Sequence, residues 1–390
     1  MAGYEVIGDE EKKALAEIFE HGGGVLFRHG FDQVRNNSFQ VKDFESEFAE
    51  YMNSPSALAV SSGTAALKVA LASININPGD EVITQSFTFV ATVEAIVESG
   101  ATPICTEIDE TLNMCPNDLI SRITPRTKAV IVVHMLGTSA KMDRIKEICD
   151  EHGLILIEDT AWGCGGEFQG KKLGTIGDIG CFSFDFAKTI TTGEGGMLTF
   201  RSQEFHQAAR AYHDHGHDNN PDFPRWEDTR TRSGFNFRMS EMQGAVGRAQ
   251  LRKLPQILKM QRSNAEQTKK IISNFPQFAI RSQHRDSIGT DDAVIFHSLG
   301  NYEATEIRKT LLEFGISTKI LPEATTWHFA GDWSHIFSVD SHSDLPIGLA
   351  FPSSRKLLKK CVSLPNGVFL RKDFHADLSR ALEKITENDA

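Results

Sequence analysis

Short apolar segments alternate with amphipathic ones through the first two thirds of the chain. Ala129–His134 and Leu154–Glu158 are almost entirely aliphatic and show no polar alternation, which is typical of strands buried on both faces. Met142–His152 instead repeats its apolar residues with helical spacing. The same pattern predicts strands at 57–60, 81–84, 180–184 and 196–200, and helices at 10–19, 42–52 and 90–99. Together these segments predict an α/β fold, with a mainly parallel sheet between layers of helices.

The pattern changes near residue 250. Leu251–Ile272 predicts a long helix with Pro255 near its start, and strands and helices alternate only weakly after it. A chain of 390 residues is also longer than the ~250–300 residues at which one hydrophobic core stops growing. We therefore expect a large domain over 1–254 and a smaller α+β domain over 255–390.

Composition and charge narrow the class of protein. The chain is 40% hydrophobic and 24% charged, which is ordinary for a globular protein. Its net charge of -11 argues against nucleic acid as a partner. The sequence has neither an apolar signal core nor a run of about 18 apolar residues, so we expect a cytoplasmic protein without membrane contact. The six cysteines form no C-x-x-C pair and are expected to be reduced.

Candidate chemistry lies where the predicted strands end, because ligands of parallel sheets bind at the carboxyl ends of the strands. Ser62–Thr64 joins a strand to a helix that continues through Ala72. Free amides and the helix dipole favour an anion at such a corner, Gly63 allows a close approach, and Thr64 adds a hydroxyl donor. A plain helix cap explains the same three residues equally well.

A carboxylate and a lysine follow at later strand ends. Asp159 ends the strand 154–158, where a buried carboxylate needs a cationic partner, although a helix cap or metal ligand is also consistent. Lys188 follows Phe184 and Phe186 and precedes a glycine-rich turn at 193–196. Desolvation there would lower its pKa, which suits imine formation. The anion corner, the strand-end carboxylate and the lysine follow one another in this order along the chain. This order favours a pyridoxal-phosphate (PLP) site, in which the carboxylate keeps the pyridine nitrogen protonated.

Several blocks resemble the DegT/StrS family of PLP-dependent sugar aminotransferases. The matching blocks are Ser61–Leu67, Gln85–Thr92, Val133–Gly137, Glu158–Asp159, Ser183–Gly196 and Gly234–Glu241, in the order of the family. The resemblance spans Val6 to Leu254. It implies the fold of aspartate aminotransferase (PLP fold type I), with a seven-stranded sheet. It also implies transfer of the amino group of L-glutamate to a keto or aldehyde sugar, which leaves 2-oxoglutarate.

The resemblance also implies a role for each matching residue. Lys188 would bind the cofactor as a Schiff base and move the proton between carbons. Asp159 would pair with the pyridine nitrogen, and Phe89 would stack on the ring. Asn236 would reach the phosphate of the neighbouring subunit's cofactor, so that a homodimer holds shared active sites. The phosphate contacts within one subunit would be Gly63, Thr64 and Ser183.

The sequence departs from the family at Trp162. The family usually has Gln there, in contact with the phenolic oxygen of the cofactor. Indole donates one hydrogen bond and accepts none, so the contacts of this oxygen must differ. A related branch has His in place of the lysine and is a dehydratase. Lys188 therefore favours amino transfer, and a PLP-dependent lyase or dehydratase is the alternative class.

Substrate contacts are less clearly marked. His213–Asp218 has a spacing that could bind a metal. The family has a His-Gly pair at this place, so we expect no metal there, and expect His215 and His217 to bind sugar hydroxyls. Trp327 and His328 either stack on the sugar or belong to the core of the small domain. Candidates for binding the carboxylate of the donor are Arg28, Arg35 and Arg238.

Two further blocks, Glu107–Leu112 and Asp214–Asp218, are similar to a narrower branch, the 8-amino-3,8-dideoxy-manno-octulosonate aminotransferases. That branch uses a free sugar acid. The leading substrate hypothesis is therefore 8-oxo-3-deoxy-manno-octulosonate, a lipopolysaccharide sugar precursor, and the alternative is a nucleotide-linked 3- or 4-keto-deoxysugar.

Overall fold

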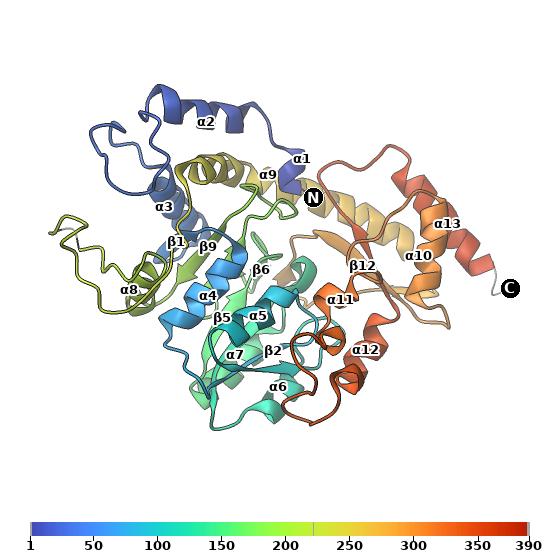
Figure 1. Cartoon of the computed structure of the whole chain (residues 1–390). Coiled ribbons are helices and arrows are strands. Elements are labelled where there is room, and N and C mark those ends of the chain that lie inside the picture. Colours follow the sequence, from blue (N-terminus) through green and yellow to red (C-terminus); the bar gives the residue numbers. More distant parts are fainter. Residues whose placement is uncertain (1, 221, 388–390) are drawn as a thin grey trace.

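A seven-stranded sheet forms the centre of the larger part of the molecule (Figure 1). The computed structural model describes residues 2–220 and 222–387. The strand order is β1-β9-β8-β5-β4-β2-β3; β9 is antiparallel to both neighbours, and all other pairs are parallel. The strands are β1 (Ser56–Val60), β2 (Glu81–Gln85), β3 (Thr102–Thr106), β4 (Thr127–Val133), β5 (Ile155–Asp159), β8 (Ile179–Ser183) and β9 (Gly196–Phe200). The predicted mainly parallel sheet is thus confirmed.

Helices cover both faces of this sheet because its aliphatic strands have no polar face. On one face, Ile131 and Ile157 pack with α4 (Gly63–Ser73), α5 (Val90–Glu98) and α8 (Gln203–Tyr212). On the other face, Val130 and Leu156 pack with α6 (Pro116–Arg122) and α7 (Met142–His152). The aromatic residues of α3 (Gln40–Met52) cover β8 on this second face. The chain enters through α1 (Ala2–Glu5) and α2 (Asp9–Glu20).

A long helix, α9 (Glu241–Ile272), joins the two parts of the chain (Figure 1). It begins ten residues earlier than predicted, because Ser240 caps its first turn and Gln243 completes a capping box. Gly244 allows close approach to α3, since a Cβ there would lie 2.7 Å from the Val41 nitrogen. The expected domain boundary after residue 254 falls inside α9, which continues through Pro255. One helix therefore packs against both parts.

The smaller part contains an antiparallel three-stranded sheet in the order β10 (Phe278–Ile280), β12 (Ala293–Ser298) and β13 (Cys361–Pro365). Helices α10 (Ala304–Glu313) and α13 (Phe374–Glu387) pack on it. The segment with α11 (Thr325–His328) and α12 (Pro352–Leu358) instead packs on the main sheet, where Trp333 and Phe351 share one apolar cluster with Phe87. This segment therefore brings C-terminal residues to the edge of the main sheet.

The remaining elements are short. β6 (Glu167–Phe168), β7 (Lys171–Lys172) and β11 (Ser287–Ile288) form a small separate sheet. Three turns among residues 2–220 and 222–387 are 3₁₀ helices: η1 (Met135–Gly137), η2 (Ala330–Asp332) and η3 (Ile347–Leu349). None of the helices in the described ranges is long and apolar enough to cross a membrane.

Candidate functional site

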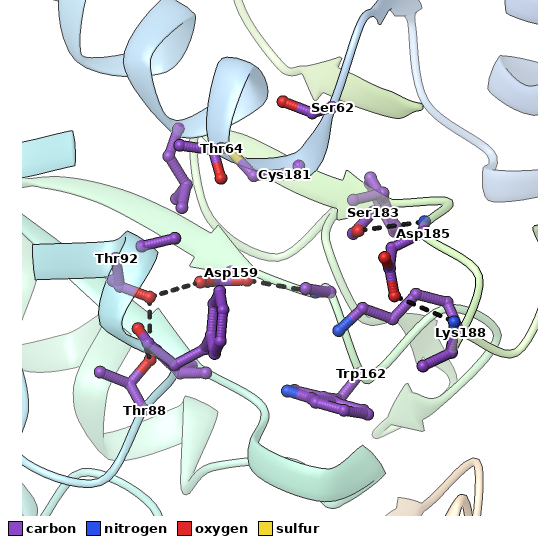
Figure 2. A pocket seen from close by; sticks show the side chains of 18 of the residues that line it. Ser62, Thr64, Thr88, Thr92, Asp159, Trp162, Cys181, Ser183, Asp185 and Lys188 are labelled. Carbon is purple, nitrogen blue, oxygen red and sulfur yellow. Dashed lines mark hydrogen bonds between the residues drawn. The ribbon is translucent and has the colours of Figure 1, made fainter. Parts of the chain in front are cut away.

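A cavity of about 330 Å³ lies where α4 begins and where β5 and β8 end (Figure 2). These ends coincide because β5 and β8 are parallel neighbours in the sheet. The cavity brings together eight residues that the sequence singled out: Gly63, Thr64, Phe89, Asp159, Trp162, Ser183, Lys188 and His328. The candidate site is therefore composed of segments that are far apart in the chain and converge at one edge of the main sheet.

Asp159 is a buried carboxylate that lines this cavity. One carboxylate oxygen accepts a hydrogen bond from the Thr92 hydroxyl at 2.8 Å, and the other accepts one from the Ala161 amide at 3.2 Å. Thr92 in turn lies 2.8 Å from the Thr88 hydroxyl, and this chain is visible in Figure 2. Burial raises the pKa of Asp159, although these hydrogen bonds and the nearby Lys188 lower it. A cation placed in the cavity would relieve that cost of burial.

Lys188 extends from the loop after β8 towards the same cavity (Figure 2). Asp185 shapes this loop, because its carboxylate accepts from the Ala187 amide at 2.9 Å and its carbonyl accepts from the Lys188 amide at 3.1 Å. Burial lowers the pKa of Lys188 to about 8, against opposing contributions from Asp292 and Asp159. The predicted desolvated lysine is thus present, and a substantial share of its amine is uncharged at mildly alkaline pH.

The first turn of α4 lies at the cavity, at the corner where the sequence predicts an anion. The Ser62 side chain caps the helix by accepting from the Ala65 amide at 3.0 Å. The amides before Ala65 have no partner within the helix, and the helix dipole makes their surroundings positive. Gly63 is required here, because a Cβ would lie 2.7 Å from the Ser183 Cβ. The segment is therefore a helix cap that also lines the cavity, and anion binding there stays a prediction.

Aromatic residues cover the other side of the cavity. Phe89 lies nearly parallel to Trp327, with ring centres 6.2 Å apart, and 5.4 Å from the His328 ring. His328 is buried and its Nδ1 bonds to the Ala324 carbonyl at 2.9 Å. Burial lowers its pKa to about 4, so its ring is neutral near pH 7. Trp327 is 60% exposed and therefore does not belong to the core.

Trp162 is a buried wall of the cavity. The Lys188 Nζ lies 3.4 Å from the centre of its indole ring, close enough for a cation–π contact. The Thr290 hydroxyl donates to the Trp162 carbonyl at 3.1 Å, which ties the residue to the C-terminal part of the chain. An indole thus occupies the place at which a smaller amide was expected from the family pattern.

The candidate arginines lie outside the cavity lining. Arg28 pairs with Glu45 at 2.6 Å and donates to the Ala59 carbonyl at 3.0 Å. Arg238 pairs with the fully buried carboxylate of Asp214. The third candidate, Arg35, is 1% exposed and donates to the Phe27 carbonyl. All three guanidinium groups are therefore engaged within the chain.

The histidine-rich loop is organised by ion pairs. His217 is buried, with its Nδ1 3.3 Å from the Asp228 carboxylate. His215 is exposed and has a left-handed backbone, with φ of 54°. Asp214 accepts from Arg225 at 2.6 Å and lies 3.0 Å from the His29 ring, and against the effect of burial these two partners hold its pKa far below the usual range. Across the described ranges, no group of three or more His, Cys, Asp or Glu side chains is placed to bind a metal ion.

Asn236 is exposed on a loop that pairs with Asp214 through a β-bridge. Its side-chain oxygen accepts from the Arg238 amide at 3.3 Å. It does not line the cavity of its own chain. Three aromatic side chains on the same loop are exposed: Phe223, Trp226 and Phe235.

Sequence reasoning missed several residues at the site. Thr88 and Thr92 follow β2 within a block that the sequence did single out, yet their link to Asp159 depends on the packing of α5 against the sheet. Ile320 reaches the cavity from the C-terminal part of the chain, and the neighbouring Lys319 contacts Trp162. No local motif marks these two residues.

Comparisons with known proteins agree with this geometry. The pattern of the DegT/DnrJ/EryC1/StrS aminotransferase family matches residues 31–383. GDP-perosamine synthase of Vibrio cholerae is 39% identical over 266 residues, which are 68% of this chain and 69% of the relative. The dTDP-4-dehydro-2,3,6-trideoxy-D-glucose 4-aminotransferase of Saccharopolyspora spinosa is 33% identical over 80% of this chain and 81% of its own. An aminotransferase structure from Psychrobacter cryohalolentis superimposes with a TM-score of 0.83 at 26% identity, covering 98% of both chains.

Proposed function

Because this chain belongs to the DegT/DnrJ/EryC1/StrS aminotransferase family, we propose that its cavity transfers the amino group of L-glutamate to a keto or aldehyde carbon of a sugar. Enzymes of this family depend on PLP, and this chain is a sugar aminotransferase with the fold of that group. The observation that carries the residue assignment is the convergence of Asp159, Lys188 and the α4 corner in one cavity.

The residues of the cavity fit PLP. Asp159 is a buried carboxylate whose pKa is raised, so a protonated pyridine nitrogen is a suitable partner. The start of α4 supplies amides for a phosphate, and the absence of a side chain at Gly63 leaves room between α4 and Ser183. Phe89 provides an aromatic face at the edge of the cavity. We assign these residues as the cofactor contacts within one subunit.

Lys188 is proposed to be the catalytic base. When bound, PLP supplies an electron sink for charge that develops at the α carbon of the amino donor. The Lys188 nitrogen removes the proton from that carbon and later returns a proton to the carbon that becomes aminated. Its pKa of about 8 suits both directions of transfer near neutral pH. Overall, glutamate becomes 2-oxoglutarate, and its amino group replaces the carbonyl oxygen of the sugar.

Two sugar classes are candidates. The names of the relatives, GDP-perosamine synthase and a dTDP-linked 4-aminotransferase, support a nucleotide-linked keto-deoxysugar. The sequence blocks at 107–112 and 214–218 support the 8-oxo octulosonate. In the structure, Glu107 accepts from the amides of Ser353 and Ser354, and Asp214 binds arginines, so both blocks have structural roles. Glu107 and Asp214 therefore provide no contact for a sugar acid within the cavity of this chain.

A second copy of the chain is proposed to complete the site. Lys188 and His328 are the basic residues among the described residues that line the cavity, and His328 is neutral near pH 7. Asn236 and the exposed aromatic residues Trp226 and Phe235 lie on one loop outside this cavity. We propose that this loop reaches the cavity of the partner subunit in a homodimer, where Asn236 would contact the phosphate.

The first test is the half-reaction with L-glutamate alone. Purified holoenzyme should show the visible absorption of bound PLP, lose it on addition of glutamate, and release one equivalent of 2-oxoglutarate. Lys188→Ala should lack that band, whereas Lys172→Ala, a lysine stacked on Tyr51 away from the cavity, should keep it. An unresponsive coloured protein would refute glutamate as donor. A band that survives in Lys188→Ala would refute the assignment of this lysine.

The amino acceptor is tested next, with enzyme that has already taken up the amino group of glutamate and lost its visible band. A GDP- or dTDP-linked 4-keto-6-deoxysugar and 8-oxo-3-deoxy-manno-octulosonate are offered separately. The true acceptor should restore the visible band and yield an amino sugar detectable by mass. Restoration by the octulosonate alone would overturn the nucleotide-linked class, and the reverse result would overturn the sugar acid.

A further inference from the structure

Two lysines converge on the indole of Trp162. The Nζ of Lys188 lies 3.4 Å from the ring centre and that of Lys319 lies 4.9 Å from it. Trp162 is 8% exposed, so both contacts are shielded from bulk water. The face of an aromatic ring attracts cations, and the attraction is strongest where the groups are desolvated. The indole therefore places a second ammonium group close to Lys188.

Lys319 is itself held by a buried carboxylate. Its Nζ pairs with Asp292, which is 1% exposed. The other carboxylate oxygen of Asp292 is buried and has no hydrogen-bond partner in the described part of the chain. The backbone on both sides is fixed, because Asn366 donates to the Asp292 carbonyl at 3.2 Å and Lys319 donates to the Ser363 carbonyl at 2.8 Å. The pair is thus a preformed part of the smaller domain.

The pair also belongs to the charge environment of Lys188. Asp292, Asp159 and Asp185 raise the pKa of Lys188, whereas Lys319 and burial lower it. His328, on the other side of the cavity, is kept neutral in part by Lys188. Asp159 and Asp185 have their own partners in the large domain. Asp292 and Lys319 are therefore the charges that the smaller domain adds to the site.

We propose that the Asp292–Lys319 pair is a positioning element that acts beside Trp162 to set the charge and placement of the Lys188 nitrogen. The proposal rests on Lys188 being the cofactor lysine of the proposed function. It also gives Trp162 a role: the indole ring attracts the second cation and keeps it next to Lys188. Removing one member of the pair must then shift the protonation of Lys188 in the opposite direction to removing the other.

The expected size follows from the distances. The two amines lie no more than about 8 Å apart, at which a partly buried charge shifts a pKa by about one unit. Lys319→Met leaves Asp292 unpaired and should raise the pH at which the Lys188 nitrogen loses its proton by about one unit. Asp292→Asn leaves Lys319 unpaired and should lower that pH by a similar amount.

The experiment titrates the visible absorption of the holoenzyme with pH, because this band reports the protonation of the Lys188 nitrogen once PLP is attached. Lys319→Arg, which keeps the charge, should titrate like the native enzyme. A matched control is the neighbouring pair, in which Lys269 contacts Asp291 at 2.6 Å. Lys269→Met and Asp291→Asn remove a neighbouring, more exposed ion pair that does not contact Trp162, and should not move the titration.

The double variant Lys319→Met with Asp292→Asn guards against misfolding of a single variant. It leaves no unpaired buried charge, so its titration should return to within about half a unit of the native one. Shifts of the same sign in both single variants, or no shift in either, would overturn the role of the pair. If Lys188→Ala keeps the native band, the proposed function fails instead, and the two failures are thereby distinguished.

Discussion

Thr92→Val removes one hydrogen bond from Asp159 while keeping the volume of the side chain. The Thr92 hydroxyl donates to the Asp159 carboxylate at 2.8 Å, and both residues are buried. In Thr92→Val the carboxylate keeps the Ala161 amide, at 3.2 Å, as its other hydrogen bond. We expect the variant to fold and to bind PLP more weakly, because the carboxylate proposed to pair with the pyridine nitrogen is less well stabilised.

The expected loss follows from the kind of bond. A hydrogen bond to a charged group contributes about 1.5–3 kcal/mol, which corresponds to roughly 10- to 150-fold in affinity. Burial already raises the pKa of Asp159, and loss of the Thr92 hydroxyl raises it further. Because pairing needs the ionised carboxylate, cofactor retention should begin to fail at a higher pH than in the native enzyme as the solution is acidified.

The assay measures the dissociation constant of PLP by its visible absorption over a pH series. Thr84→Val is the matched control, since the buried Thr84 hydroxyl donates at 2.9 Å to the Ile131 carbonyl in the same sheet but away from the cavity. The control should lose about 1 kcal/mol of unfolding free energy and no cofactor affinity. Equal PLP affinity in Thr92→Val and Thr84→Val would refute the assigned role of Asp159.

Three further variants test other parts of the site. Asp159→Asn should still bind PLP but slow the half-reaction by about 100-fold or more, and an unchanged rate in stopped-flow absorption would remove Asp159 from its role. Asn236→Asp would place a negative charge beside the phosphate of the partner's cofactor and weaken PLP retention by about tenfold in the dimer, so unchanged retention would contradict the shared site. His328 has a pKa near 4 when folded and 6.5 when unfolded, so the unfolded chain binds the extra proton and stability falls by up to about 1.4 kcal/mol per pH unit from pH 6.5 to 4. His328→Gln should lose this acid sensitivity in urea titrations, and a retained pH slope would assign it to other groups.

The sequence alone located the centre of the candidate site. Aliphatic runs without polar alternation indicate strands buried on both faces, and such strands assemble into parallel sheets whose carboxyl ends meet at one edge. Asp159 and Lys188 lie at or after the ends of two of those strands. Strand order and direction are therefore enough to predict that the two residues lie close together. The start of α4 at Gly63 was equally predictable, because a strand–turn–helix junction is a local feature.

Some elements were not predicted from the sequence. β3, which begins with the exposed Thr102, lies at the edge of the sheet and has the weaker apolar signal of an edge strand. α9 begins well before Leu251 because Ser240 caps it, and its polar first turns are stabilised by packing against α3. In both cases tertiary contacts outweigh a modest local preference.

The tertiary structure decided which charged residues face the cavity. Arg28 and Arg238 were reasonable carboxylate receptors from the sequence, yet Glu45 and Asp214 bind them within the chain. Lys319 had no motif at all, and it reaches Trp162 from the C-terminal part of the molecule. The sequence therefore determined the fold and the cofactor chemistry, and it placed Asp159 and Lys188 at neighbouring strand ends, because these depend on local pattern and strand direction. Ion pairing and burial depend on groups from separate segments of the chain meeting in space, and only the folded chain determines which of them meet.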